Sequence, residues 1–234
     1  SDGIKSKIEQ QVWFHRQVAR VLYLAKRTKP ETLVATAFLA TRVTKCDEDD
    51  IKKLQRLLKY IRSVRERGIV LKPGCGDVTV TQYIDAAYGV HADGKGHTGS
   101  VTIIGDAAVV DAASKKQTIV AKSSTEAELI GVSDSLGKGF HMRRFIIAQG
   151  HTVDNVVLYQ DNLSTMALLN KGRASSDRTR HIDIRYFWVK ERIDNGEVVV
   201  KHMRTELMLA DILTKPLQGS AFVEERDALT NWPA

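Results

Sequence analysis

The spacing of apolar residues changes at residues 72–76, and this change restricts the possible folds more than any other feature of the chain. In the segment before it, apolar residues such as Phe14, Val18 and Val21 recur every three or four positions, as in helices that bury one face. After it, short apolar runs that suit strands mix with longer helical patterns. The stretch Lys72-Pro73-Gly74-Cys75-Gly76 has the composition of a linker or tight turn. We therefore expect a helical segment at 1–72 and a separate domain after it.

The helical segment should form a small bundle. A first helical pattern starts near Val12 and is broken by Pro30, and a second apolar stretch covers residues 33–43. The acidic cluster Asp47-Glu48-Asp49-Asp50 then stands where the dipole of a helix N-terminus favours negative charge, ahead of an apolar stripe that begins at Ile51. Three helices that each bury one face predict a compact helical unit.

The following domain, predicted at 77–222, should be an α/β fold with a mixed sheet and helices packed on it. Strands followed by alternating helices and strands are typical of this class. A C-terminal tail is expected at 223–234. The expected elements are strands at 78–81, 99–105, 107–110 and 117–121, a helix from Ser124, a buried central strand at 156–159, helices at 164–170 and 182–193, a strand at 197–202 and a closing helix around Leu209.

The positive charge of the chain is concentrated in its first part. Residues 1–76 hold 17 Lys and Arg against 8 Asp and Glu, net +9, and the residues from 77 onward hold 18 against 20, net −2, which together give the formal charge of +7. A basic region beside a slightly acidic one suits a clamp for a polyanion attached to a metal-binding catalytic module. A solvated surface that serves only solubility fits the charge equally well.

Cysteine content and hydropathy argue against several classes of protein. The two cysteines, Cys46 and Cys75, form no Cys-x-x-Cys pair, so neither a structural zinc site nor a disulfide framework is indicated. No apolar stretch approaches the ~20 residues that a transmembrane helix needs, and the start, Ser1-Asp2-Gly3, is neither a signal peptide nor an initiator methionine. We therefore expect a soluble, intracellular piece of a longer protein.

Acidic residues stand next to predicted buried elements. Asp85 closes the first strand, Asp161 follows the central strand, and Glu128 lies beside core-facing Leu129 on the first helix of the domain. If the two strands are neighbours, both aspartates emerge at one edge of the sheet, where a metal is one of the few compensations for buried charge. A turn or helix-capping role is the alternative for each aspartate.

Two further acids, taken alone, are explained by ordinary structural roles. Glu126 is assigned to capping, because Ser123-Ser124-Thr125-Glu126 is close to a capping box. Asp211 stands among apolar neighbours on the expected closing helix and would by itself be an ordinary surface position.

Four blocks of sequence, in this order, resemble the ribonuclease H domain of copia-type LTR retrotransposon Pol polyproteins. The resemblance extends over residues 83–222, and residues 18–61 look like the thumb or connection segment that precedes this domain. The blocks are Ser123-Ser124-Thr125-Glu126-Ala127-Glu128-Leu129, Tyr159-Gln160-Asp161-Asn162, Thr179-Arg180-His181-Ile182-Asp183-Ile184-Arg185-Tyr186-Phe187 and Leu209-Ala210-Asp211-Ile212-Leu213-Thr214-Lys215-Pro216-Leu217.

The resemblance implies a ribonuclease H-like mixed five-stranded sheet and hydrolysis of the RNA strand of RNA/DNA hybrids during reverse transcription. It places the catalytic, metal-binding acids at Asp85, Glu128, Asp161 and Asp211, with two Mg²⁺ expected and Mn²⁺ as a substitute. Asp85 would bridge the ions, Glu128 and Asp161 would complete the site of one, and Asp211 would help to hold the other. The implied partners are the hybrid and an upstream reverse transcriptase domain, in virus-like particles in the cytoplasm.

Polar and basic residues around these acids are candidates for holding the hybrid. Those near the acids would contact sugars and bases, and a basic loop would grip phosphates. Caps, turns and a merely solvated face are the alternatives. The candidates are Gln117, Ser123, Ser124 and Asn162 near the acids, and Arg173, Arg178, Arg180, His181 and Arg185 in and after the loop.

The chain departs from the family in two places, which keeps other functions open. Many members have Asp-Ala-Asp-Trp where this chain has Asp85-Ala86-Ala87-Tyr88. Cellular ribonucleases H carry a histidine in the loop before the last acid. His202 stands near the corresponding position but is interpreted as the end of the last strand. The alternatives are a catalytically inactive hybrid-binding or tether module of a reverse transcriptase and, on the same fold, an integrase-type strand transferase. The Tyr-x-Asp-Asp signature of reverse transcriptases is absent, so polymerisation is not expected.

Overall fold

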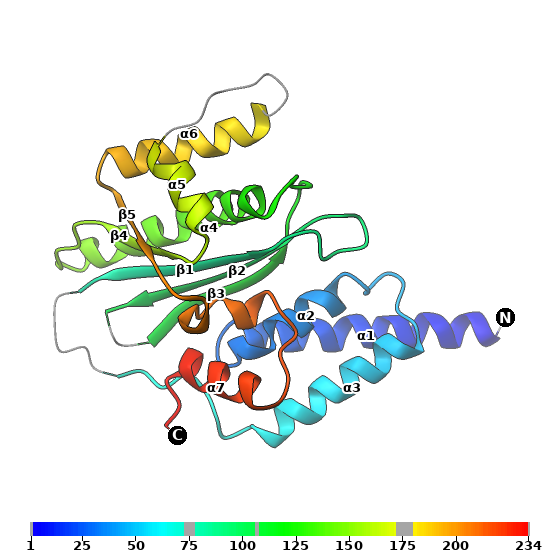
Figure 1. Cartoon of the computed structure of the whole chain (residues 1–234). Coiled ribbons are helices and arrows are strands. Elements are labelled where there is room, and N and C mark those ends of the chain that lie inside the picture. Colours follow the sequence, from blue (N-terminus) through cyan, green and yellow to red (C-terminus); the bar gives the residue numbers. More distant parts are fainter. Residues whose placement is uncertain (1, 73–77, 106–107, 172–179, 234) are drawn as a thin grey trace.

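The computed structural model describes residues 2–72, 78–105, 108–171 and 180–233. A sheet lies between two layers of helices (Figure 1). One layer holds the helices of the N-terminal segment together with the last helix of the chain, and the other holds the three helices that follow the first three strands. None of the described helices is both long and apolar enough to cross a bilayer.

The N-terminal segment forms the three predicted helices, α1 (Asp2–Ala25), α2 (Leu33–Ala40) and α3 (Glu48–Ser63). Pro30 starts a short 3-10 turn, η1 (Pro30–Thr32), after α1 has ended. The acidic cluster acts as predicted, because Asp47 caps α3 by accepting a hydrogen bond from the amide of Asp50 at 2.9 Å. The helices bury a common apolar core made of Phe14, Val18, Val21, Leu39, Leu54 and Leu57.

The sheet has five strands in the order β3-β2-β1-β4-β5, which confirms the predicted mixed sheet. The strands are β1 (Val80–Ala87), β2 (His97–Ile104), β3 (Ala108–Lys116), β4 (Val156–Gln160) and β5 (Val198–His202). The first three form an antiparallel meander, and β4 and β5 join it in parallel with β1. As a result, the carboxyl ends of β1 and β4 lie at the same edge of the sheet.

The helices α4 (Ser124–Ala148), α5 (Leu163–Lys171) and α6 (Arg180–Asp194) form one layer, as expected. Ser123 caps α4 by accepting a hydrogen bond from the amide of Glu126 at 3.2 Å, and Glu126 accepts one from the amide of Lys122. The capping interpretation of Glu126 is therefore confirmed. Facing residues of α4 and the strands, such as Leu129, Leu136 and Ile84, are fully buried in the main core.

Three details of the predicted domain are wrong. Residues 117–121 are not a strand, because the chain turns there toward α4 and β3 instead covers Ala108–Lys116. Asp85 lies inside β1, which continues to Ala87, and does not close the strand. The expected helix around Leu209 is a single 3-10 turn, η4 (Asp211–Leu213), and the last helix, α7 (Gly219–Thr230), comes later.

The helical segment and the sheet share an apolar cluster. Ala25 and Leu33 pack with the sheet residues Val101, Val109 and Ala112 and with Ile212, Leu213 and Leu229 from η4 and α7. Arg67 forms an ion pair with Asp227 of α7, and the amide of Val70 donates a hydrogen bond to the carbonyl of Thr230 at 2.8 Å. Helix α7 runs across the expected start of the tail at residue 223. The division into 1–72, 77–222 and 223–234 stays a prediction.

Candidate metal centre

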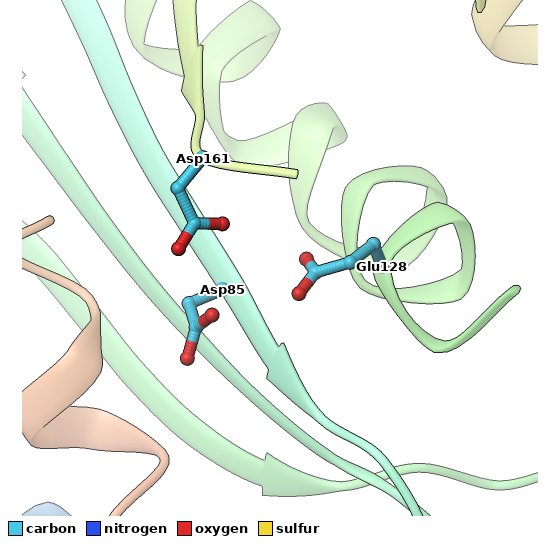
Figure 2. Close-up of side chains that lie close together, drawn as sticks. All are labelled: Asp85, Glu128 and Asp161. Carbon is cyan, nitrogen blue, oxygen red and sulfur yellow. The ribbon is translucent and has the colours of Figure 1, made fainter. Parts of the chain in front are cut away.

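Three carboxylates from three different elements converge at one edge of the sheet. Asp85 of β1, Glu128 of α4 and Asp161, which directly follows β4, each offer one oxygen, and these three oxygens all lie within 4.8 Å of one another. Figure 2 shows the three carboxylates turned toward a common space. The structure therefore brings together three of the four acids that the sequence suggested.

Strand register explains why the two aspartates meet. Tyr83 of β1 pairs with Tyr159 of β4 in a parallel ladder, and each aspartate follows its tyrosine by two residues. Because side chains two residues apart point to the same face of a strand, Asp85 and Asp161 emerge side by side. Glu128 reaches the same point because the first turns of α4 pack on β1 through buried residues on either side of it.

Burial makes the charges of this site costly. Asp85 and Glu128 are each only 4% exposed. Burial, together with the negative charge of Asp211, raises the pKa of Asp85 to about 6, although the hydroxyl of Thr214 opposes the change. Burial and the neighbouring charge of Asp85 raise the pKa of Glu128 well above its ordinary value. Clustered carboxylates of this kind are destabilised by one another, and a hard divalent cation with oxygen ligands removes that repulsion.

Neutral donors hold each carboxylate in place. Glu128 accepts hydrogen bonds from the amide of Ala86 at 3.2 Å and from the side-chain amide of Gln160 at 2.9 Å. The hydroxyl of Thr205 donates to Asp161 at 2.9 Å. The hydroxyl of Thr214 donates to Asp85. Such partners fix the orientation of metal-ligating groups without neutralising them. The donor set therefore fits a divalent metal ion.

Asp211, the fourth predicted acid, lies close to the centre but faces a lysine. It stands at the start of η4, and its side chain is 11% exposed. Both of its carboxylate oxygens accept hydrogen bonds from the ammonium of Lys215, at 2.9 and 2.8 Å. Its charge nevertheless reaches Asp85, whose pKa it raises. Asp211 is thus a neighbour of the three converging carboxylates rather than a member of that group.

A glycine allows η4 to approach the metal centre. Gly99 of β2 pairs directly with Asp85. A Cβ atom at Gly99 would lie 2.6 Å from the carbonyl oxygen of Ala210 and 2.9 Å from side-chain atoms of Leu213 and Thr214. Because position 99 has no side chain, the turn that carries Asp211 and Thr214 lies directly on the sheet beside Asp85.

Sequence reasoning missed several members of this site. Gln160 and Thr214 lie inside the family blocks but have no obvious role there. Thr205 begins a 3-10 turn, η3 (Thr205–Leu207), in a stretch without any distinguishing pattern. Lys215 follows Asp211 by four residues, a spacing that favours ion pairs and was available in the sequence. Glu225 of α7 was also missed: burial and the charge of Asp211 raise its pKa to about 6.

Several of the candidate hybrid-binding residues already have structural partners. Gln117 is buried and donates to Thr98 and to the carbonyl of Ala127, Asn162 accepts from the amide of Thr165 at 3.0 Å, and Arg185 pairs with Asp134. Ser123 caps α4, and Ser124 is exposed at its first position. Their contacts with nucleic acid stay predictions. Arg173 and Arg178 lie outside the described residues, as do the side chains of Arg180 and His181.

His202 behaves as the sequence suggested. It is the last residue of β5 and pairs with Gln160 in the parallel ladder between β4 and β5. Its side chain is exposed at the end of the strand. The interpretation as a strand end is therefore confirmed.

Comparison with known proteins relates the chain to transposon polyproteins. No family model matches it. It is 30% identical over 206 residues to the retrovirus-related Pol polyprotein from transposon RE1 of Arabidopsis thaliana. The matched region is 88% of this chain and 14% of that protein. It is 26% identical over 205 residues to the corresponding polyprotein from transposon TNT 1-94 of Nicotiana tabacum, covering 88% of this chain and 15% of that protein. The chain thus spans about one-seventh of the relatives it matches.

Among solved structures, the chain is similar to ribonuclease H1 from the halophilic archaeon Halobacterium salinarum NRC-1. The TM-score is 0.39 and the identity 19%, over 67% of this chain and 96% of that one. The five strands and the mixed pairing described above agree with the mixed five-stranded sheet that the sequence blocks implied. This chain is therefore similar to one segment of the retrovirus-related Pol polyproteins of transposons.

Proposed function

We propose that this chain is a ribonuclease H that cuts the RNA strand of RNA/DNA hybrids during reverse transcription of a retroelement, by two-metal-ion catalysis. The observation that carries the proposal is the convergence of Asp85, Glu128 and Asp161, two of them buried, with one oxygen of each within 4.8 Å of the others. A fold alone does not define an activity, so the proposal depends on this site.

The acids define what the chain would hold. Asp85, Glu128 and Asp161 would bind one divalent ion, and Asp211 would contribute to a second ion beside Asp85. Bound Mg²⁺ supplies an activated water, neutralises charge on the phosphate and assists the departing 3′ oxygen. Mg²⁺ is favoured because all the ligands are hard oxygens, and Mn²⁺ is the expected substitute.

The remaining residues of the site keep the acids from turning away. Gln160 and the amide of Ala86 fix both oxygens of Glu128, so its carboxylate has one orientation. Thr214 and Thr205 do the same from one side for Asp85 and Asp161. Because the carboxylates are already held in place, little rearrangement should be needed when an ion and then the substrate bind.

Substrate binding is proposed for the basic parts of the chain. The first 76 residues have a net charge of +9, which suits attraction to a nucleic-acid backbone. The loop with Arg173, Arg178, Arg180 and His181 would grip phosphates, while polar residues near the acids, such as Asn162, would reach sugars. The proposed setting is a virus-like particle, and the proposed neighbour is a reverse transcriptase domain of the same polyprotein.

The decisive experiment is cleavage of an end-labelled RNA/DNA hybrid with Mg²⁺ or Mn²⁺. The chain should cut the RNA strand of the hybrid and leave single-stranded RNA and double-stranded DNA intact. Asp161→Asn should abolish cutting, because it removes a ligand charge at the half-buried edge of the site. Asp154→Asn, a change of the same type in the exposed loop before β4, is the matched control and should cut normally.

The second candidate function is an inactive module that only binds the hybrid. Two observations favour it: Ala87 stands where many family members have a second acid, and Lys215 engages both oxygens of Asp211. Binding of the hybrid without cutting under either metal would support this candidate and would refute the nuclease.

A further inference from the structure

Lys215 places a fixed positive charge beside the metal centre. Its ammonium lies 2.9 and 2.8 Å from the two carboxylate oxygens of Asp211, and the lysine side chain is 44% exposed whereas that of Asp211 is 11% exposed. The lysine side chain is therefore more exposed than the carboxylate that it contacts. Neutral hydroxyl and amide groups hold the other three acids and supply no opposite charge, whereas Lys215 supplies one to Asp211.

The charge of Lys215 interacts with three of the four acids. Burial lowers the pKa of Lys215, but its hydrogen bonds to Asp211 and the charges of Asp85, Asp211 and Asp161 outweigh this and raise it. Of these acids, Asp211 is the one whose oxygens the described contacts join to the ammonium. A cation at this place meets the electrostatic need that a second divalent ion would meet.

A lysine and a metal ion compete for the same oxygens. An ionised carboxylate offers a small number of lone pairs, and an ammonium placed between its two oxygens uses those that face it. Asp85, Glu128 and Asp161 have no such cationic partner among the described contacts, and their oxygens converge. The two parts of the centre therefore differ: the oxygens of Asp85, Glu128 and Asp161 are available to an ion, whereas those of Asp211 are occupied by the Lys215 ammonium.

We propose that Lys215 stands in for the second metal ion in the resting protein, and that this ion binds only by displacing the lysine from Asp211. This inference rests on the proposed nuclease function and adds to it an order of loading. The first ion binds Asp85, Glu128 and Asp161 without displacing a bonded side-chain cation. The second binds weakly until a hybrid is present, since the released ammonium can then pair with a backbone phosphate. Lys215 is thus a positioning residue that acts through Asp211.

The test is a titration of the chain with Mn²⁺ in the absence of nucleic acid. Binding is monitored by calorimetry and by the electron paramagnetic resonance signal of free Mn²⁺. The unchanged chain should bind one ion tightly and a second weakly. Lys215→Met should tighten the second ion about tenfold, the size of effect expected when a charge-assisted contact at a half-exposed site no longer competes. Lys215→Gln should behave in the same way and guards against a folding defect particular to Met.

A double-mutant cycle separates an effect of Lys215 through Asp211 from a general effect of its charge on metal binding. If Lys215 acts through Asp211, adding Lys215→Met to an Asp211→Asn chain should leave Mn²⁺ binding unchanged. Lys190→Met is the matched control, because Lys190 also pairs with an acid four residues away, Asp194, but on α6. Equal second-ion affinity in the unchanged chain and in Lys215→Met would overturn the inference. The same tightening in the Asp211→Asn background would also overturn it.

Failure of this inference is distinguishable from failure of the nuclease proposal. If the chain binds its first ion and cuts the hybrid while Lys215→Met has no effect on Mn²⁺ binding, only the role of Lys215 is refuted. If the unchanged chain binds no Mn²⁺ and leaves the hybrid whole, both proposals fall.

Discussion

Asp85 is the residue of this site whose protonation has the clearest effect on the stability of the fold. Its pKa is about 6 in the folded chain because of burial and the charge of Asp211, whereas an unfolded chain gives Asp a value of about 3.9. The folded chain therefore binds more protons than the unfolded chain between about pH 4 and about pH 6. The stability that this group contributes is complete below that window and is lost as the pH rises through it.

Asp85→Asn should therefore stabilise the metal-free protein at neutral pH. Above pH ~6 the variant should exceed the parent in free energy of unfolding by on the order of 1–3 kcal/mol, and the difference should close below pH ~4. Urea unfolding in chelator from pH 4 to pH 8 measures this directly. Excess Mg²⁺ at pH 8 should stabilise the parent and not the variant. A difference that stays constant with pH would contradict the prediction.

Single residues of the site differ in how well the sequence reveals them. Asp85 and Asp161 were detectable because each stands near the end of an apolar run, and the register of β1 and β4 then brings them together. Thr205 is different, since the sequence does not distinguish its hydroxyl from that of any turn residue, and only the fold brings it to Asp161. The pairing of Asp211 with Lys215 is local and follows from their spacing.

At the scale of elements, the contact between β2 and η4 decides whether Asp211 and Thr214 reach the centre. Gly99→Ala should push η4 away from the sheet, because the new Cβ would overlap the carbonyl of Ala210. We expect a loss of about 1–3 kcal/mol in stability and a larger proportional loss of cleavage than of hybrid binding. Gly137→Ala on α4 is the control, since its Cβ would meet nothing within 4 Å.

The outcome for these glycine variants is measured by thermal unfolding, hybrid binding and cleavage. Gly137→Ala should keep full activity and gain slightly in stability, as expected when Ala replaces Gly on an exposed helical face. Full cleavage by Gly99→Ala would show that the approach of η4 to the sheet is unimportant for function.

Elements with strong periodic patterns were predictable, and those fixed by distant partners were not. The apolar spacing of α4 and the run at β4 placed both correctly. Strand β3 contains alanines, an aspartate and lysines, so its pattern is weak, and only pairing with β2 makes it a strand. The β-branched residues at 117–121 suggested a strand by propensity, but Gln117 instead bonds to Gly96 and to Ala127 at a turn.

At the scale of the whole molecule, the helical segment and the sheet should unfold together. Leu33, at 2% exposed, packs with residues of β2, β3, η4 and α7. Leu33→Ala should cost about 2–5 kcal/mol and shift a single transition. Denaturation of variants that keep only Trp13 or only Trp188 reports the two parts separately. Leu71→Ala, at a position 72% exposed, should change stability by less than about 0.5 kcal/mol.

Coincident transitions in both single-tryptophan variants would mean that the shared cluster makes one cooperative unit. Two separate transitions, of which only the one at Trp13 moves with Leu33→Ala, would contradict the prediction. They would support the division at residues 72–77 as a true boundary between independently folding units.

The pairing of β1 with β4 also governs when the metal centre can exist. The hairpins of β1, β2 and β3 join residues near in sequence, whereas β1 meets β4 only after α4 has crossed over the sheet. Loop closure of this kind is slow compared with hairpin formation, so we expect Asp85 and Asp161 to meet late in folding. If divalent ions bind only the finished fold, a higher metal concentration should shift the folding equilibrium toward folded chains.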